Sequence, residues 1–248
     1  MNLSSYNIKD IQQKTDWQSF WNAYRTIEAQ QEADLFFQVG KTVNKLPITY
    51  DILTKMVENI VQSLKLTKKD ILLELCCGNG LLTYQLSNFS GFIYAFDFAK
   101  QMIDNAKRFK NNKNIIYTIG DAKANFFELF EFEEMPNKFL INDSLAYFTE
   151  DDLKTILATI LENSKNFSFY ITGIPCEELK WNFYDTEERK KTYLSYVENG
   201  ECYNNGMGKW WSIIELKQLA LAYGMECIIE MPSKFYNYRV NALLEKQP

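Results

Sequence analysis

The stretch that decides the fold is Ile71-Leu72-Leu73-Glu74-Leu75-Cys76-Cys77-Gly78-Asn79-Gly80, and the helical pattern of residues 81–86 follows it at once. Residues 71–75 form a short, mostly apolar run, which predicts a buried strand. The two glycines permit a tight turn into the helix, because glycine adopts backbone conformations closed to other residues. In open α/β sheets such a turn lies at the carboxyl end of a strand, where ligands bind. The stretch therefore predicts a strand, a ligand-binding turn and a helix.

The alternation of strands and helices continues along the chain. Further strands are predicted at 92–96, 115–119, 138–141, 167–172, 226–230 and 238–244, and further helices at 52–64, 102–109, 151–161 and 213–223. Alternating strands and helices pair in parallel through right-handed crossovers. The last two strands lie close together in sequence, which indicates a hairpin with at least one antiparallel edge strand. We expect a doubly wound α/β fold with a mainly parallel, seven-stranded sheet.

Two segments frame this core. Apolar residues between Trp17 and Val39 recur mostly at intervals of three and four, which predicts a helix. The stretch 177–211, after the fifth strand, is charged and aromatic without a sustained period. It is interpreted as a lid, with an ordinary surface excursion as the alternative. We expect a single domain, divided into an N-terminal helical cap (1–50), a cofactor-binding core (51–175), a lid insertion (176–211) and a C-terminal helix with a strand hairpin (212–248).

Composition excludes several classes of function. The chain has 248 residues, 46% of them hydrophobic, and 27 Lys and Arg against 32 Asp and Glu give a net charge of -5. No basic patch stands out, which disfavours a nucleic-acid partner. The absence of histidine excludes imidazole bases and histidine-ligated metal sites, and no metal site is predicted. Five cysteines, two of them adjacent, suit neither a disulfide framework nor a metal knuckle.

Location and assembly follow from the same survey. No apolar run approaches the ~20 residues that cross a bilayer, and the amino-terminal residues lack the pattern of a signal peptide. The cysteine usage suits a reducing compartment. We expect a cytoplasmic protein without membrane insertion, either a monomer or a homodimer.

Acidic residues follow the second and third strands. Asp97 could accept hydrogen bonds from both vicinal hydroxyls of a ribose, and Asp121 could accept one from the exocyclic amine of adenine. Phe98 and Met102 stand where they could cover a flat base. Each residue alone has a commoner structural role, the aspartates as helix caps and the other two as core. Taken together they indicate a nucleoside ligand.

These residues together resemble the class I S-adenosylmethionine-dependent methyltransferases. The first motif of that family is an acidic strand end followed by a glycine loop, and here it reads Glu74 to Gly80, with Cys76 where the commonest form has its first glycine. Asp97 and Asp121 match the acidic residues of the second and third motifs. Asn142-Asp143-Ser144-Leu145 matches the fourth. The resemblance covers roughly residues 50–175.

The resemblance implies S-adenosylmethionine as the cofactor and S-adenosylhomocysteine (SAH) as the product. A weaker similarity of residues 37–42 and 236–239 to methyltransferases of bacterial surface-polysaccharide pathways implies that Gln38, Lys41 and Thr42 close over the cofactor's carboxylate. In this similarity Arg239 faces the acceptor. The cofactor-binding residues implied are Gln38, Lys41, Thr42, Glu74, Cys76, Gly78, Asn79, Gly80, Asp97, Phe98, Met102, Asp121, Ala122 and Asn142.

Asp143 and Arg239 are the candidate catalytic residues. Methyl transfer is an in-line displacement, so the protein mainly aligns the nucleophile and, where necessary, removes a proton. Without histidine, Asp143 is the first candidate base, whereas an anionic oxygen needs none. We expect a small-molecule acceptor with an oxygen nucleophile, phosphate-type or sugar-linked, from a surface-polysaccharide or related pathway. The alternatives are a non-catalytic S-adenosylmethionine-binding partner subunit, an N- or C-methyltransferase of a secondary metabolite, and an NAD-linked oxidoreductase. Thr83, in place of a third glycine, weakens the last of these.

Overall fold

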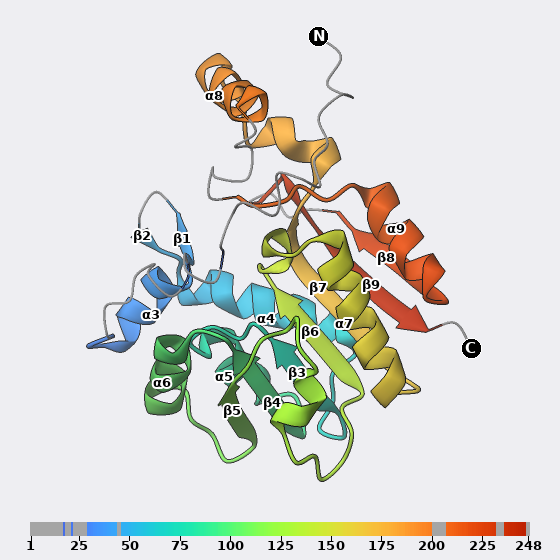
Figure 1. The fold of residues 1–248 in the computed structure, drawn as a ribbon. Coiled ribbons are helices and arrows are strands. Elements are labelled where there is room, and N and C mark those ends of the chain that lie inside the picture. Colours follow the sequence, from blue (N-terminus) through green and yellow to red (C-terminus); the bar gives the residue numbers. More distant parts are fainter. Residues whose placement is uncertain are drawn as a thin grey trace.

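The central element is a twisted, seven-stranded sheet with helices on both faces, seen in a computed structural model that describes residues 17, 21, 29–43, 46–199, 207–231 and 236–246 (Figure 1). The strand order is β5-β4-β3-β6-β7-β9-β8. Neighbours from β5 to β7 pair in parallel, whereas β9 is antiparallel to both β7 and β8. The strands are β3 (Ile71–Leu75), β4 (Phe92–Asp97), β5 (Ile115–Ile119), β6 (Lys138–Asn142), β7 (Ser168–Pro175), β8 (Met225–Glu230) and β9 (Arg239–Lys246). The expected fold class is confirmed.

The helices divide the apolar core into two layers. The layer on one face of the sheet contains buried residues of α4, α5 and α6, and the other contains those of α7 and α9. Their bounds are α4 (Tyr50–Leu64), α5 (Leu81–Leu86), α6 (Lys100–Phe109), α7 (Glu150–Asn163) and α9 (Ile213–Ala222), with the short helices η2 (Phe126–Leu129) and η3 (Leu145–Tyr147). None of the helices in the described part of the chain is long and apolar enough to cross a membrane. Burial of both sheet faces explains why the strands are nearly continuous apolar runs.

The N-terminal segment corrects one expectation. A continuous helix from Trp17 to Val39 is wrong, because the chain is not helical at residues 29–31. Helix α3 (Glu32–Gln38) starts afresh there, and Asp34 accepts hydrogen bonds from the backbone nitrogens of Gln30 and Gln31. This polar cap competes with helix continuation. A small antiparallel ribbon of β1 (Thr42–Val43) and β2 (Leu46–Pro47) follows. The rest of the expected cap, at residues 1–16, 18–20 and 22–28, lies outside the described residues.

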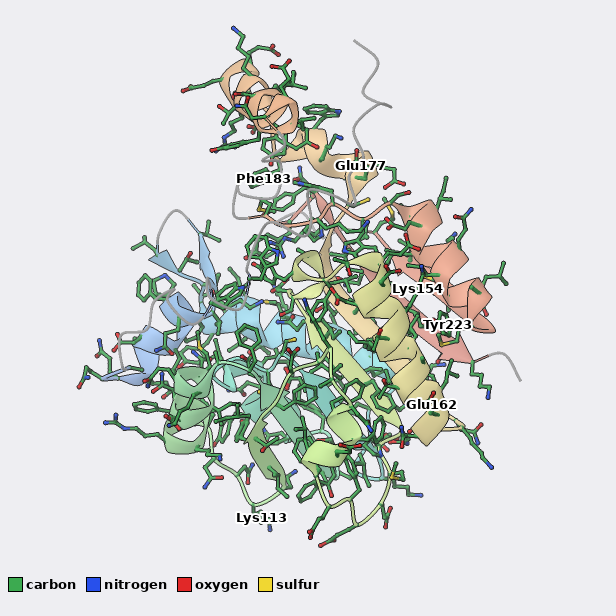
Figure 2. The ribbon with its side chains drawn as sticks, in the orientation of Figure 1. Lys113, Lys154, Glu162, Glu177, Phe183 and Tyr223 are labelled. Carbon is green, nitrogen blue, oxygen red and sulfur yellow. The ribbon has the colours of Figure 1, made fainter. Side chains whose placement is uncertain are left out.

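The insertion after β7 forms a structure of its own. It contains η4 (Glu177–Asn182) and α8 (Glu187–Glu198), and α8 stands away from the sheet in Figure 1. Glu177 and Phe183 mark where the insertion leaves the body of the molecule (Figure 2). Its aromatic side chains pack on one another, with Tyr184, Tyr193 and Trp210 buried together. Residues 200–206 of the expected lid lie outside the described residues.

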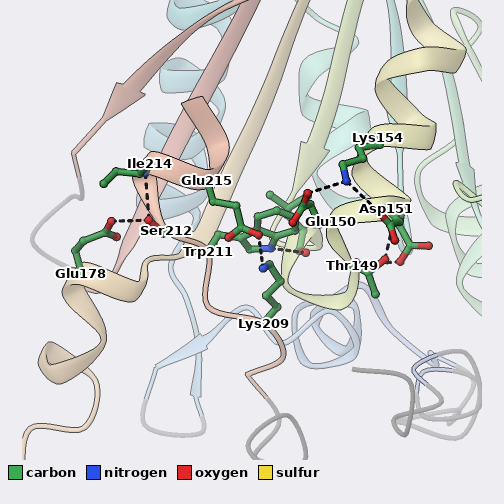
Figure 3. A network of polar contacts seen from close by, with 12 residues as sticks. Thr149, Glu150, Asp151, Lys154, Glu178, Lys209, Trp211, Ser212, Ile214 and Glu215 are labelled. Carbon is green, nitrogen blue, oxygen red and sulfur yellow. Dashed lines mark hydrogen bonds and ion pairs between the residues drawn. The ribbon is translucent and has the colours of Figure 1, made fainter. Parts of the chain in front are cut away.

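A polar network joins the insertion to the start of α9 (Figure 3). One carboxylate oxygen of Glu178 accepts hydrogen bonds from the Ser212 hydroxyl and the Ile213 backbone nitrogen, both at 3.0 Å. The indole nitrogen of Trp211 donates to the carbonyl of Leu145 at 3.1 Å. These contacts fix both ends of the insertion near the sheet.

Candidate active site

A cavity of about 610 Å³ opens at the carboxyl ends of β3, β4, β5 and β6. This volume lies in the usual range for small-molecule sites. Most of the residues expected in the site line it: Lys41, Glu74, Cys76, Gly78, Asn79, Asp97, Phe98, Met102, Asp121, Ala122, Asn142, Asp143 and Arg239. The strands of a parallel sheet end at one edge, so residues distant in sequence meet there.

Left-handed backbone conformations build the turn after β3. Gly78 and Gly80 have φ angles of 56° and 72°, and Cys76 has a φ of 59°. A β-carbon at Gly80 would lie 2.6 Å from the hydroxyl oxygen of Tyr117. Only glycine adopts this conformation at no steric cost, so Cys76 holds a conformation that favours the glycine of the commoner motif. The turn keeps the motif's path despite the substitution.

Asp97 is fixed by the glycine turn and by its own loop. Its Oδ2 accepts from the backbone nitrogen of Gly78 and its Oδ1 from that of Ala99, both at 2.9 Å. Burial raises the pKa of Asp97, although these two hydrogen bonds oppose the shift. Each carboxylate oxygen keeps a further lone pair. Asp97 can therefore brace the turn and accept hydrogen bonds from a ribose at the same time.

Glu74 is the most deeply buried carboxyl of the cavity, with 1% of its surface exposed. Its Oε2 has no hydrogen-bond partner among the described residues. Burial raises its pKa to about 7, and the charge of Lys41 opposes the rise. A buried, unpaired carboxylate oxygen is costly unless a ligand pairs with it. The ammonium group of a bound amino acid is a fitting partner.

The opposite end of the cavity carries a cluster of three charged residues, Lys41, Asp143 and Arg239. Lys41 Nζ pairs with Asp143 Oδ2, and Arg239 Nη1 lies 3.0 Å from Asp143 Oδ1. Burial alone would raise the pKa of Asp143, but the charges of Lys41 and Arg239 hold it below its ordinary value. A carboxylate with a lowered pKa is a weak proton acceptor. The geometry favours charge pairing over general-base chemistry for Asp143.

Aromatic side chains wall the same end. The ring centroid of Tyr147 lies 4.8 Å from that of Trp17 and 5.3 Å from that of Trp21. Tyr236 also lines the cavity. Sequence reasoning anticipated tryptophans in the cap but missed Tyr147 and Tyr236. Their closeness in sequence to Asp143 and Arg239 is the one signal that could have found them.

Three expected site residues do not line the cavity, namely Gln38, Thr42 and Gly80. Gln38 braces the turn from behind, because its Oε1 accepts from the side-chain amides of Asn79 and Asn105 at 3.0 and 3.1 Å. The described part of the insertion, residues 177–199 and 207–211, contributes no lining side chain either. Its role as a lid stays a prediction.

Comparison with known proteins places the domain. Residues 72–166 match the family model described as a methyltransferase domain. A 23S rRNA (uracil(1939)-C(5))-methyltransferase of Francisella tularensis subsp. novicida is 29% identical over 114 residues, which are 46% of this chain and 23% of that protein. The chain thus matches less than a quarter of the length of this curated relative.

Solved structures resemble the chain over nearly its whole length. The DhpI complex with SAH has a TM-score of 0.58 at 14% identity and covers 97% of both chains. The magnesium protoporphyrin IX methyltransferase of Synechocystis PCC 6803, with bound SAH, has a TM-score of 0.57 at 12% identity and covers 98% of this chain and 100% of its own. The resemblance to class I methyltransferases noted in the sequence is confirmed, and the expected cofactor agrees with these matches.

Proposed function

We propose that this protein is an S-adenosylmethionine-dependent methyltransferase that methylates an anionic oxygen of a small-molecule acceptor. One observation carries the proposal: a single cavity joins an acidic half, built on the glycine turn, to a cationic and aromatic half. The first half suits the cofactor and the second suits the acceptor. The residues present fit both groups.

The cofactor half offers the partners that S-adenosylmethionine needs. The cofactor brings a sulfonium and an ammonium cation, a ribose and an adenine. Glu74, Asp97 and Asp121 line this half. Glu74 would meet the ammonium group, Asp97 the ribose hydroxyls and Asp121, with Ala122, the adenine. Bound there, the cofactor supplies an electrophilic methyl group.

The acceptor half holds more positive than negative charge. Lys41 and Arg239 face the single carboxylate of Asp143. An anionic acceptor oxygen would balance the remaining positive charge and needs no base. In the displacement the oxygen's electron pair forms the new bond to the methyl carbon, and the broken bond leaves its pair on sulfur. The aromatic wall of Trp17, Trp21 and Tyr147 supports a sugar-linked acceptor from a polysaccharide or related pathway.

The cysteines support small-molecule chemistry without a covalent enzyme intermediate. A thiol nucleophile needs a lowered pKa. Burial raises the pKa values of Cys76 and Cys77 well above the ordinary value. Burial and the neighbouring Glu178 raise the pKa of Cys176 to about 12. None of these three thiols fits the role of a nucleophile towards a nucleic-acid base.

Calorimetric titration with SAH tests the cofactor half, with NAD as the competing ligand. We expect SAH to bind and NAD not to bind. Asp97→Ala removes two charge-assisted hydrogen bonds, so its affinity for SAH should fall by at least about 100-fold. The matched control is Asp104→Ala, because Asp104 on α6 pairs only with the exposed Lys100 in the described contacts. Unchanged SAH affinity in Asp97→Ala, or binding of NAD, would reject the assignment.

Transfer of labelled methyl groups tests the acceptor half. Sugar phosphates, sugar carboxylates and their uncharged counterparts form the acceptor panel. We expect methylation of anionic acceptors, impaired in Arg239→Ala and retained in Asp143→Asn. The reverse pattern, with uncharged hydroxyls methylated and Asp143→Asn inactive, supports a general base. Binding of SAH without transfer to any acceptor supports the non-catalytic alternative.

A further inference from the structure

A β-bulge interrupts β7 where the sheet meets the acceptor half of the cavity. Ile171 pairs with Ala242 and Ile174 with Val240, so β7 advances three residues while β9 advances two. Gly173 lies in this irregular step and has a φ of 68°. Bulges redirect the backbone and are frequent beside active sites. The bulge turns the peptide groups of Gly173 away from regular strand pairing.

Both peptide groups of Gly173 find side-chain partners. Its nitrogen donates to Asn241 Oδ1 at 3.0 Å, and its carbonyl accepts from Arg239 Nη1 at 2.8 Å. The same Arg239 nitrogen donates to Asp143 Oδ1 at 3.0 Å. The bulge therefore supplies the second oxygen that fixes the direction of the Arg239 guanidinium.

The missing side chain of Gly173 is equally important for Asp143. A β-carbon at this position would lie 1.6 Å from Asp143 Oδ1 and 2.7 Å from its Cγ. Asp143 itself has a φ of 54°, a conformation that non-glycine residues seldom adopt. Strained backbone persists where surrounding contacts determine it, and it concentrates at functional sites. Here the strain brings the Asp143 carboxylate into the space that Gly173 leaves open.

We propose that Gly173 is a positioning residue, which holds Asp143 and Arg239 so that the cluster with Lys41 binds the anionic oxygen group of the acceptor. Gly173 does not line the cavity, so it acts through these two side chains. The inference rests on the proposed function, and it adds a specificity-determining feature in β7. The ligand class is a small oxyanion, either a phosphoryl or a carboxylate group.

A matched glycine separates crowding from backbone strain. Gly224, between α9 and β8, also has a φ of 68°, but a β-carbon there would meet nothing within 4 Å. Gly173→Ala and Gly224→Ala therefore carry a similar backbone cost. Only the first displaces the Asp143 carboxylate.

The experiment uses the full chain saturated with SAH, with inorganic phosphate and acetate as probes in separate titrations. Binding is followed by calorimetry, and SAH affinity is measured for each variant. We expect wild type and Gly224→Ala to bind one probe equally. Gly173→Ala should bind it at least about tenfold more weakly, with SAH affinity unchanged. The preferred probe tells a phosphoryl acceptor from a carboxylate acceptor.

The melting temperature of each variant gives a second readout, which holds even where probe binding is weak. Gly173→Ala should melt lower than Gly224→Ala in the wild-type background. In an Asp143→Ala background this difference should nearly vanish, because the atoms that Gly173→Ala would meet are gone. A persistent difference overturns the inference.

Three further outcomes separate the two proposals. Equal probe affinity in Gly173→Ala and Gly224→Ala overturns the positioning role, and so does binding of neither probe to SAH-saturated wild type. Failure of wild type to bind SAH instead rejects the proposed function.

Discussion

The cofactor half of the cavity is built from residues close to one another in sequence, whereas the acceptor half joins distant ones. Glu74, Asp97 and Asp121 each follow or end one of three neighbouring strands. In contrast, Asp143 pairs with Lys41 and Arg239, which are 102 and 96 positions away. The cofactor half is packed, acidic and held by backbone, and the acceptor half is held by side-chain charges. We expect substitutions in the two halves to differ in size and in pH dependence.

The largest effect is expected for a glycine of the packed half. A β-carbon at Gly80 would lie 2.6 Å from the Tyr117 hydroxyl and 3.1 Å from the Ala106 β-carbon. Gly80→Ala adds this overlap to a left-handed backbone, so it should cost roughly 4 kcal/mol of unfolding free energy. Gly40, beside Lys41, has a similar φ of 65° and open space around it. Gly40→Ala should therefore cost only about 1 kcal/mol. Equal losses in urea unfolding would contradict the contrast between the halves.

The second prediction concerns the pH dependence of the packed half. The pKa of Glu74 is about 7 in the folded chain, against an ordinary value of 4.5. As pH rises between these values the unfolded chain loses the proton and the folded chain keeps it, so wild-type stability falls. Glu74→Gln mimics the protonated form. It should exceed wild type by roughly 3 kcal/mol at pH 8 and by less than about 1 kcal/mol at pH 5.

Urea unfolding at the two pH values measures this difference. Calorimetry of SAH binding in buffers of different ionisation enthalpy should also report release of a proton near pH 6, because an ammonium partner stabilises the Glu74 carboxylate. A constant difference between Glu74→Gln and wild type across pH would mean that Glu74 titrates normally.

The same contrast explains what the sequence could predict. Strands β3 and β5 and helix α5 have the predicted bounds, because short apolar runs end at glycine or polar turns. The cofactor half follows from these strand ends. The break before α3 was missed, because a hydrophobic period does not report the local Asp34 cap. The Lys41–Asp143–Arg239 cluster depends on pairing of β9 with β7 and on the bulge at Gly173, which no local pattern encodes.

A smaller effect is expected in the acceptor half. Asp143→Asn removes the carboxylate from two cations, but 31% of the Asp143 side chain is exposed, so solvent screens the loss. We expect a loss of about 1–2 kcal/mol of stability and a change of less than about tenfold in SAH affinity. Asp143 has a lowered pKa in the folded chain. Its contribution is present above the ordinary value of 3.8 and is lost only as pH falls below it.

Between pH 5 and 8 the difference between Asp143→Asn and wild type should therefore be constant, unlike that of Glu74→Gln. Urea unfolding over this range provides the measurement. A difference that grows from pH 5 to pH 8 would show that Asp143 carries a raised pKa, as a general base requires.

The smallest effect is expected where two adjacent cysteines differ only in backbone conformation. Cys76 has a φ of 59°, whereas Cys77 is not among the residues with positive φ. In Cys76→Gly the relief of left-handed strain, about 1 kcal/mol, offsets the lost side-chain contacts and the greater freedom of glycine in the unfolded chain. Stability should therefore change by less than about 0.5 kcal/mol. Cys77→Gly has no strain to relieve and removes a side chain that is 7% exposed, so it should cost about 2 kcal/mol. Equal losses in the two variants would show that the conformation of Cys76 carries no strain, and that this turn is indifferent to its missing glycine.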